Sequence, residues 1–317
     1  MILSNMLGST NEKNIIDDGN KIKRLYMRLS DNVGNTPLIP ITLGNLTVWG
    51  KAEFMNPGGS VKDRMASYIL NNAEKEGLIK KGDTLCEATS GNTGIAFAML
   101  AAERGYKIKI IMPSNMSEER KAMMKFYGAE LIQVEEGDFD GAIEMRNDLC
   151  KAKGWFNCDQ FHNHLNIEAH YNNTGPEIVS QLGLILPDAF IAGTGTGGTI
   201  MGVGKYLKEN YKNIEIIAVE PAESAVMSGG EPGLHGIQGI GDGSKFLVDL
   251  DFIDEVVTVK TEEAKEQAIR LAKRYGLFVG ISAGANTFAA QRWLKYNNKE
   301  NAITILCDRG ERYFSCL

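Results

Sequence analysis

Short apolar runs alternate along the chain with longer stretches in which apolar residues recur every three or four positions. The short runs are rich in β-branched residues and predict strands over 46–53, 107–112, 129–134, 189–192, 214–219, 255–259 and 302–307. The longer stretches predict helices over 64–76, 93–104, 118–127, 139–153, 168–182, 198–209, 261–275 and 284–297. This strict alternation predicts an α/β fold whose parallel sheets are covered by helices on both faces.

The ends of these stretches carry residues that helix termini favour. Ser117, followed by two glutamates, predicts an N-cap with first-turn carboxylates. Six glycines follow helical stretches at places where a left-handed residue closes a helix, namely Gly77, Gly105, Gly128, Gly154, Gly183 and Gly276. We therefore expect positive φ angles at these six positions.

Composition narrows the class of protein. The chain has 317 residues, of which 43% are hydrophobic and 23% charged, and this ordinary globular usage excludes a disordered chain. Its length predicts two lobes, and a net charge of −6 argues against a nucleic-acid partner. The cysteines Cys86, Cys150, Cys158, Cys307 and Cys316 show neither disulfide nor zinc spacing. This spacing gives no reason to expect a metal. No apolar run is long enough to span a membrane, so we expect a cytoplasmic protein without a membrane partner.

Glycine is abundant, with 35 residues, and three glycine-rich segments carry candidate chemistry. Residues 193–199 follow a predicted strand and open a helix, so their backbone N–H groups and the helix dipole suit a phosphate. Gly193, Gly195 and Gly198 also satisfy G-x-G-x-x-G, with Glu220 at the end of the next strand. At this point an NAD-dependent dehydrogenase remains an alternative.

The second segment, 56–64, combines a Pro-Gly-Gly turn with a lysine at the start of a helix. Ser60 is a candidate cap for that helix. The positive end of the helix, with Arg64 close by, is expected to lower the pKa of Lys62 from about 10.4, as an amine that condenses with a carbonyl requires. The alternative is a solvated lysine on an amphipathic helix.

The third segment, 87–94, again leads from a strand through a turn into a helix. Thr89, Ser90, Asn92 and Thr93 offer hydroxyls, an amide and helix-terminal N–H groups that suit a carboxylate, or serve as an ordinary N-cap. Two anion-binding loops and one activated lysine together fit a phosphorylated carbonyl cofactor and an amino-acid substrate.

These three segments closely resemble the cysteine synthase and cystathionine β-synthase family, the fold type II enzymes that use pyridoxal 5'-phosphate. The resemblance runs from about residue 32 to 313 and includes 112–120, 160–161, 168–171, 174–178, 236–241, 280–284 and 310–313. It implies two three-layer lobes with mainly parallel sheets, like tryptophan synthase β, and a homodimer. It also makes the dehydrogenase a distant alternative, because G-x-G-x-x-G alone is a weak signal.

The resemblance also implies a role for individual residues. Lys62 would form the Schiff base and move the Cα proton, Asn92 would bond the phenolic oxygen of the cofactor, and Ser282 would face its pyridine nitrogen. The implied phosphate contacts are Gly195, Thr196, Gly197, Gly198 and Thr199. The implied contacts to the substrate carboxylate are Thr89, Ser90, Gly91, Thr93 and Gln160.

We expect three parts along the chain. Residues 1–33 would be an N-terminal extension, polar and without regular structure over its first 20 residues. Residues 56–163 would form a smaller mobile lobe that binds the substrate carboxylate, and 34–55 with 164–317 a larger lobe that binds the cofactor phosphate. The cofactor would lie between the lobes, with the smaller one closing on substrate.

Asp242 departs from the family pattern. It follows Gly239-Ile-Gly241, where relatives carry a small or an aromatic residue, and the alternative reading is a residue of a Gly-Asp-Gly turn. A carboxylate there predicts a general acid and base that handles water in β-elimination and β-replacement through an aminoacrylate. The favoured reaction is L-cysteine and water to L-serine and hydrogen sulfide, or condensation of cysteine with a thiol. The alternatives are cysteine synthesis from O-acetylserine and sulfide, and condensation of serine with homocysteine.

Overall fold

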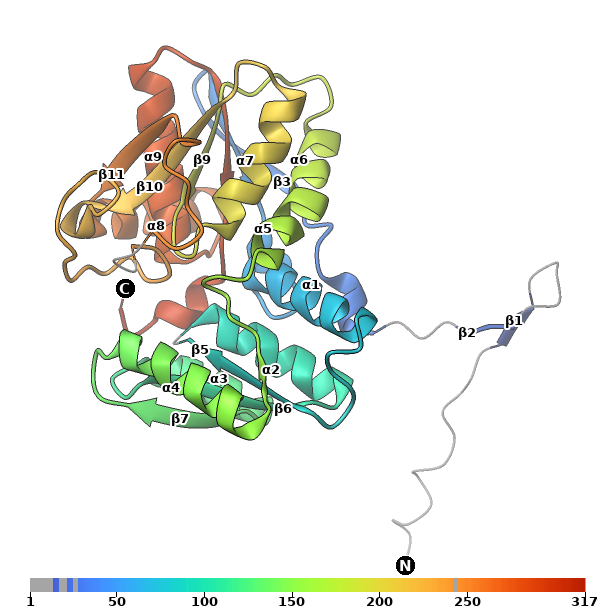
Figure 1. Ribbon diagram of the computed structural model, residues 1–317. Coiled ribbons are helices and arrows are strands. Elements are labelled where there is room, and N and C mark those ends of the chain that lie inside the picture. The colour runs from blue at the N-terminus through green and yellow to red at the C-terminus, as the bar shows by residue number, and fades with distance from the viewer. Residues whose placement is uncertain (1–13, 17–21, 25–27, 90, 242–244, 317) are drawn as a thin grey trace, which may run out of the picture.

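The computed structural model of this chain describes residues 14–16, 22–24, 28–89, 91–241 and 245–316. Its main body contains two β-sheets, each with helices on both faces (Figure 1). The six-stranded sheet has the order β11-β10-β9-β12-β4-β3, and the four-stranded sheet the order β7-β6-β5-β8. Every neighbouring pair is parallel except β3 and β4. Two covered, mainly parallel sheets confirm the predicted fold class.

The strands are short, and the inner strands of each sheet are mostly buried. The six-stranded sheet contains β3 (Leu38–Leu43), β4 (Leu46–Lys51), β9 (Ala189–Gly193), β10 (Glu215–Pro221), β11 (Glu255–Val259) and β12 (Asn301–Ile305). The four-stranded sheet contains β5 (Thr84–Ala88), β6 (Lys107–Pro113), β7 (Glu130–Val134) and β8 (Phe156–Asn157). The four-stranded sheet comes from residues between 84 and 157, here called the smaller part, and the six-stranded sheet from residues on either side, here called the larger part; the division at 34, 56 and 164 stays a prediction.

Helices cover the two sheets in layers. They are α1 (Lys62–Lys75), α2 (Asn92–Arg104), α3 (Glu118–Phe126), α4 (Phe139–Lys153), α5 (Leu165–Ala169), α6 (Gly175–Leu182), α7 (Gly198–Asn210), α8 (Thr261–Tyr275) and α9 (Ile281–Tyr296). On the four-stranded sheet, α4 covers one face and α2 the other; on the six-stranded sheet, α9 backed by α8 covers one face and α6 with α7 the other. Among the described residues, none of the helices combines the length and apolarity needed to cross a membrane.

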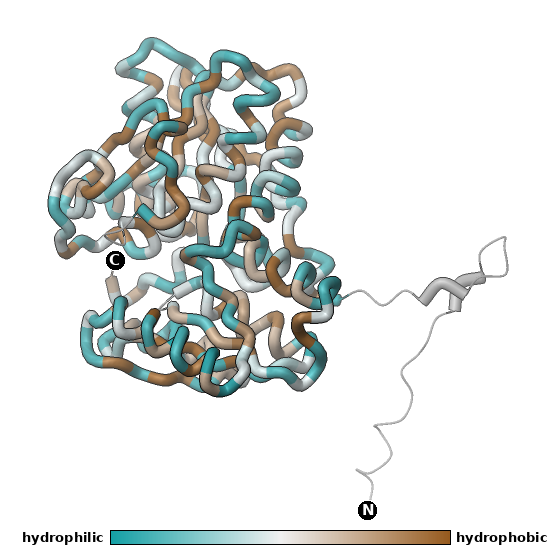
Figure 2. The backbone as a smooth tube through the Cα atoms, in the orientation of Figure 1, coloured by the Kyte–Doolittle hydropathy of each residue, from teal (hydrophilic) through white to brown (hydrophobic). Residues whose placement is uncertain are grey.

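Four apolar clusters form between these layers. Two lie on the six-stranded sheet, around Ile191 with Leu271 and around Phe190 with Leu207. The other two lie on the four-stranded sheet, around Phe97 and around Ile111. Apolar stretches follow the inner strands and helix faces in Figure 2, as expected for sheets buried on both sides.

Local signals at helix ends predicted the structure well. The predicted helices 139–153 and 261–275 and the strand 255–259 have the observed bounds. All six helix-closing glycines have positive φ. The Ser117 hydroxyl accepts a hydrogen bond from the backbone N–H of Arg120 at 3.4 Å, which confirms the predicted cap.

Three parts of the chain differ from the prediction. A β3–β4 antiparallel hairpin, closed by the Gly44-Asn45 turn with φ +64° at Gly44, lies where strict alternation predicts only parallel strands. The stretch 168–182 is not one α-helix, because a π-helix over His170–Thr174 separates α5 from α6. Near the N-terminus, β1 (Asn14–Ile16) pairs with β2 (Ile22–Arg24), whereas the sequence predicts no strand there.

Candidate active site

One pocket of about 580 Å³ lies between the two sheets. Residues from both parts line it, and its size suits a small-molecule ligand. The lining includes most of the predicted site residues, namely Lys62, Thr89, Gly91, Asn92, Thr93, Gln160, Gly195, Thr196, Gly197, Thr199 and Ser282. The structure therefore brings three segments far apart in sequence to one place. Ser90 and Asp242 lie outside the described residues.

The predicted phosphate loop connects β9 to the start of α7. None of the described residues accepts a hydrogen bond from the backbone N–H of Gly195, Thr196 or Gly197. Gly197 has a φ of +91°, and a Cβ there would lie 2.6 Å from Val248 Cγ2. Unpaired N–H groups at a helix N-terminus, beside threonine hydroxyls, form a donor set that fits a phosphate.

Gly198 has a different position from its neighbours in the loop. It is absent from the pocket lining, and its missing side chain leaves room for the Asn166 amide against its Cα. That amide donates to the Thr196 hydroxyl at 3.0 Å and to the Gln160 carbonyl oxygen at 3.0 Å. Gly198 therefore supports the loop from behind through Asn166, a residue to which sequence reasoning gave no role.

A buried histidine supports the same loop. His170 Nε2 lies 3.1 Å from the Thr199 hydroxyl, and its Nδ1 lies 2.9 Å from the Thr174 hydroxyl. Burial, together with the charges of Arg64 and Lys62, holds the pKa of His170 well below its ordinary value. The ring is therefore neutral and can donate with one nitrogen and accept with the other. His170 and Thr174 lie in the segments 168–171 and 174–178, which resemble the family, so the sequence held a signal for both residues.

Lys62 is the first residue of α1 and lines the pocket. Its backbone N–H donates to the Ser60 hydroxyl at 3.3 Å, although the N-cap position itself is Val61 and not Ser60. Arg64 is paired elsewhere: its guanidinium lies 2.6 Å from Glu53 and 2.7 Å from Glu177. This pairing with two carboxylates offsets the Arg64 charge that the sequence places close to Lys62.

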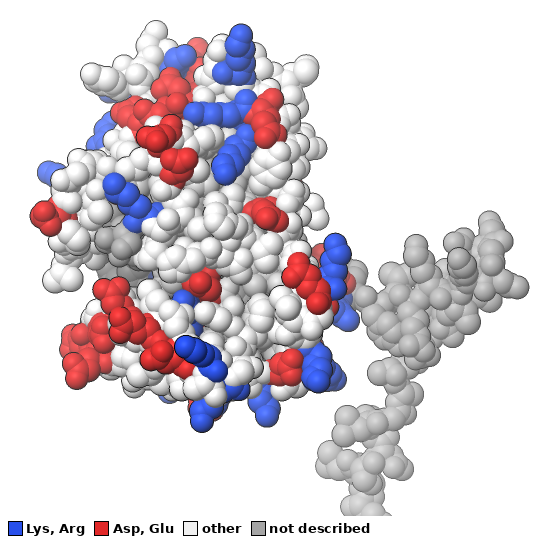
Figure 3. Space-filling view, viewed as in Figure 1, with Lys and Arg blue, Asp and Glu red and all other residues white. Residues whose placement is uncertain are grey.

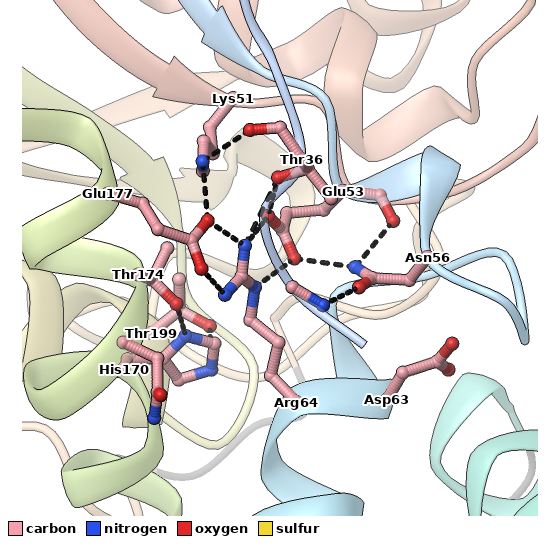
Figure 4. A network of polar contacts seen from close by, with 12 residues as sticks. Thr36, Lys51, Glu53, Asn56, Asp63, Arg64, His170, Thr174, Glu177 and Thr199 are labelled. Carbon is pink, nitrogen blue, oxygen red and sulfur yellow. Dashed lines mark hydrogen bonds and ion pairs between the residues drawn. The ribbon is translucent and has the colours of Figure 1, made fainter. Parts of the chain in front are cut away.

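The Arg64 pairs belong to a buried polar network (Figure 4). Glu53 also accepts from the Thr36 hydroxyl at 2.6 Å, and Glu177 accepts from Lys51 at 2.7 Å. The Arg64 and Lys51 charges lower the pKa of Glu177 to about 2, against the effect of burial. Because removing one member would leave a buried charge unpaired, the network fixes α1, and with it Lys62, against β4 and α6.

Two of the predicted carboxylate contacts bond to each other. The Thr93 hydroxyl donates to Gln160 Oε1 at 2.6 Å, and Gln160 Nε2 donates to the Ala88 carbonyl oxygen at 3.2 Å. Thr89 accepts from the backbone N–H of Gly91 at 3.2 Å. These bonds shape the turn between β5 and α2 at the edge of the pocket. That the turn binds a substrate carboxylate stays a prediction.

Two predicted cofactor contacts remain, Ser282 in the larger part and Asn92 in the smaller part. Ser282 is buried in the first turn of α9. Cys307 lines the pocket with it, and burial raises the pKa of this thiol to about 12, although Ser282 acts in the opposite direction, so the thiol stays protonated. Asn92 opens α2 and bonds Asp308 and Arg312, partners that sequence reasoning did not identify.

The dehydrogenase alternative placed Glu220 against a ribose. The carboxylate of Glu220 is instead buried and accepts from the backbone N–H groups of Met227 and Ser228 at 2.7 and 3.0 Å. Its oxygens hold the loop that follows β10. Both carboxylate oxygens of Glu220 are therefore used within the protein, which argues against a ribose contact.

Comparison with known proteins also points to a pyridoxal-phosphate enzyme and away from a dehydrogenase. The family described as "Pyridoxal-phosphate dependent enzyme" matches residues 29–308. The cysteine synthase of Staphylococcus aureus is 44% identical over 294 residues, covering 89% of this chain and 94% of that protein. The crystal structure of O-ureido-L-serine synthase is similar with a TM-score of 0.89 and 36% identity, covering 92% and 95% of the two chains. That of a hydrogen sulfide-producing enzyme from Fusobacterium nucleatum has a TM-score of 0.87 and 39% identity, covering 92% and 100%.

This chain belongs to the pyridoxal-phosphate dependent enzymes. Within them it is a cysteine synthase-like enzyme, and its cofactor is pyridoxal 5'-phosphate. The pocket fits that group: the backbone N–H groups of Gly195, Thr196 and Gly197, which have no acceptor among the described residues, suit the phosphate, and a lysine lines the same cavity.

Proposed function

We propose that this enzyme converts L-cysteine and water to L-serine and hydrogen sulfide, or condenses cysteine with a thiol, and that Asp242 handles the water. The observation that carries this proposal is where the sequence neighbours of Asp242 lie. Gly241 and Phe246, the first described residue before Asp242 and the second after it, both line the pocket. Similarity to a hydrogen sulfide-producing enzyme supports the same reaction.

Each step has a residue to perform it. When bound, pyridoxal 5'-phosphate supplies the electron sink that weakens the bonds at Cα and Cβ of an amino acid. Lys62 Nζ removes and returns the Cα proton. The Ser282 hydroxyl is neutral and does not hold the pyridine nitrogen protonated, which favours chemistry at Cβ over transamination. The C–S bond breaks, Asp242 takes a proton from water as a C–O bond forms at Cβ, and that proton leaves with the sulfide.

Acidic side chains at one edge of the pocket support cysteine over free sulfide as substrate, although Lys62 and Arg120 also line the pocket. Asp140 lines the pocket at the start of α4. Acidic side chains gather over this end of the smaller part in Figure 3. The exposed acids there are Glu135, Glu136, Asp138, Asp140 and Glu144. Negative charge repels hydrosulfide anion but not zwitterionic cysteine, whose net charge is zero.

Cysteine synthesis from O-acetylserine and sulfide is the second candidate. The 44% identical Staphylococcus aureus protein named cysteine synthase favours it. Condensation of serine with homocysteine, a homodimer and a cytoplasmic location remain predictions.

The substitution Asp242→Asn tests the proposal with cysteine as the sole substrate. We expect the rate of serine and sulfide formation to fall by about 10²–10⁴-fold, the range for loss of a general acid and base. Asp148→Asn, an exposed acid on α4, is the control and should keep the rate. An unchanged rate in the Asp242 variant would eliminate its role. Faster cysteine formation from O-acetylserine than sulfide formation from cysteine would favour the second candidate.

A further inference from the structure

The side-chain amide of Asn92 lies between a carboxylate and a guanidinium. Its Nδ2 donates to Asp308 Oδ2 at 2.7 Å, and its Oδ1 accepts from Arg312 Nη1. Asp308 is fully buried and Arg312 is 2% exposed, so both partners meet Asn92 from inside the fold. Asn92 itself lines the pocket.

The chemistry of the two partners fixes which way the amide points. A guanidinium has donors alone, so it must face the amide oxygen. Asp308 Oδ2 already accepts from the Tyr313 hydroxyl at 2.6 Å and so meets Asn92 as an acceptor. A flipped amide would place N–H against N–H and oxygen against oxygen. This arrangement settles an orientation that an asparagine alone leaves open.

Each member of this pair also bonds to the fold, Arg312 to the Gly58 carbonyl oxygen and Asp308 to the Tyr313 hydroxyl, but neither side chain is fully satisfied. Asp308 Oδ1 and Arg312 Nε have no hydrogen-bond partner among the described residues, although both are buried, and such groups cost free energy. Gly280 leaves no room for a Cβ beside Asp308 Oδ1. The fold therefore accommodates a carboxylate at 308 at a cost in stability.

We propose that Asp308 and Arg312 are positioning residues that hold Asn92 so that its second Nδ2–H faces the pocket as a donor. The acceptor is the phenolic oxygen of the cofactor, which a donor stabilises in its deprotonated form. The inference rests on the proposed placement of the cofactor against Asn92. It does not depend on which amino acid is the substrate.

The absorbance spectrum of the substrate-free holoenzyme tests this inference. A deprotonated phenolic oxygen gives the visible band of the cofactor and a protonated one the near-ultraviolet band. In Asp308→Asn/Arg312→Gln, both neighbours can donate or accept, so the amide can flip. We expect the ratio of visible to near-ultraviolet absorbance to fall about fivefold, the effect of one net hydrogen bond. Each single substitution should shift it less, in the same direction, and Asp188→Asn should leave it unchanged.

The variant Asn92→Ala distinguishes a failure of the positioning inference from a failure of the proposed cofactor placement. When combined with Asn92→Ala, the two substitutions should change the spectrum no further, because they act through the amide. An unchanged spectrum in the folded double variant, or an equal change when Asn92→Ala is also present, would overturn the inference. If the double variant does not fold, the single variants decide by the same criteria. An unchanged spectrum in Asn92→Ala alone would instead reject the placement of the cofactor. Sulfide release from cysteine enters none of these outcomes, so failure of the proposed reaction is separately visible.

Discussion

Burial controls the charge of two carboxyl groups beside the pocket. Asp63 follows Lys62 and accepts from the backbone N–H of Gly58 at 2.5 Å, while its other oxygen has no partner among the described residues. Burial raises its pKa to about 7, although Gly58 and Arg312 act in the opposite direction. Burial also raises the pKa of Glu87 to about 7, even though Arg146 lies 3.2 Å away. Both groups change charge near neutral pH.

Asp63→Asn should remove part of the pH dependence of stability. The folded pKa of about 7 is above the unfolded value of 3.8, so the native state binds more protons in this window. The stabilisation is complete below the unfolded pKa and is lost as pH rises through about 7. Because one pKa unit corresponds to about 1.4 kcal/mol, we expect the difference between wild type and variant to change by up to about 4 kcal/mol. Urea unfolding at several pH values measures it; a constant difference would contradict the prediction.

Some residues of the site can be predicted from the sequence and others cannot. Lys62, Thr93 and Gly197 stand in local strand–turn–helix segments, where a few neighbouring residues specify the backbone and indicate the chemistry. Asn92 and Asp308 are 216 residues apart, and their contact depends on how the two sheets pack. The same applies to Arg64, whose partners come from other elements. Sequence therefore predicts groups that contact a ligand better than groups that orient them.

At the scale of elements, predictions were accurate where local residues determine the boundary. Helix α4 begins at the Asp138 cap and ends at Gly154, and its predicted bounds are the observed ones. The π-helix after α5 has no such local signal, and it packs against α7, an element that lies later in the chain. The two-residue strand β8 was too short to produce a period.

Gly197→Ala should weaken cofactor binding through the loop between β9 and α7. Alanine is disfavoured at φ +91°, and its Cβ would lie 2.6 Å from Val248. We expect the dissociation constant of pyridoxal 5'-phosphate, from absorbance titration of the apoenzyme, to rise at least about tenfold, or about 1.4 kcal/mol. Gly154→Ala is a matched control, since it has φ +66° and open space around it. It should lower stability by about 1 kcal/mol and leave cofactor affinity unchanged. Equal affinities in the two variants would show that this loop does not hold the cofactor.

At the scale of the molecule, the pocket lies where the two sheets face each other. Its outer lining comes from 115–120 before and within α3 and from 232–241 in the larger part. These segments belong to different parts of the fold, so a change in their spacing would open or close the pocket. The predicted carboxylate contacts Thr89, Gly91 and Thr93 also line the pocket, and they belong to the smaller part alone.

A ligand with a carboxylate should therefore bring the two parts together, whereas one without it should not. L-serine and ethanolamine share an amine and a hydroxyl and differ by the carboxylate, so they form a matched pair for the holoenzyme. We expect L-serine to slow amide hydrogen exchange severalfold in 115–120 and in 232–241, because closure removes water from both. Ethanolamine should leave both segments unchanged, and helix α8, on the outer face, is the internal reference for either ligand. Equal protection by both ligands would assign closure to the amine or hydroxyl. Protection confined to residues 91–93 would mean that the carboxylate binds without moving the smaller part.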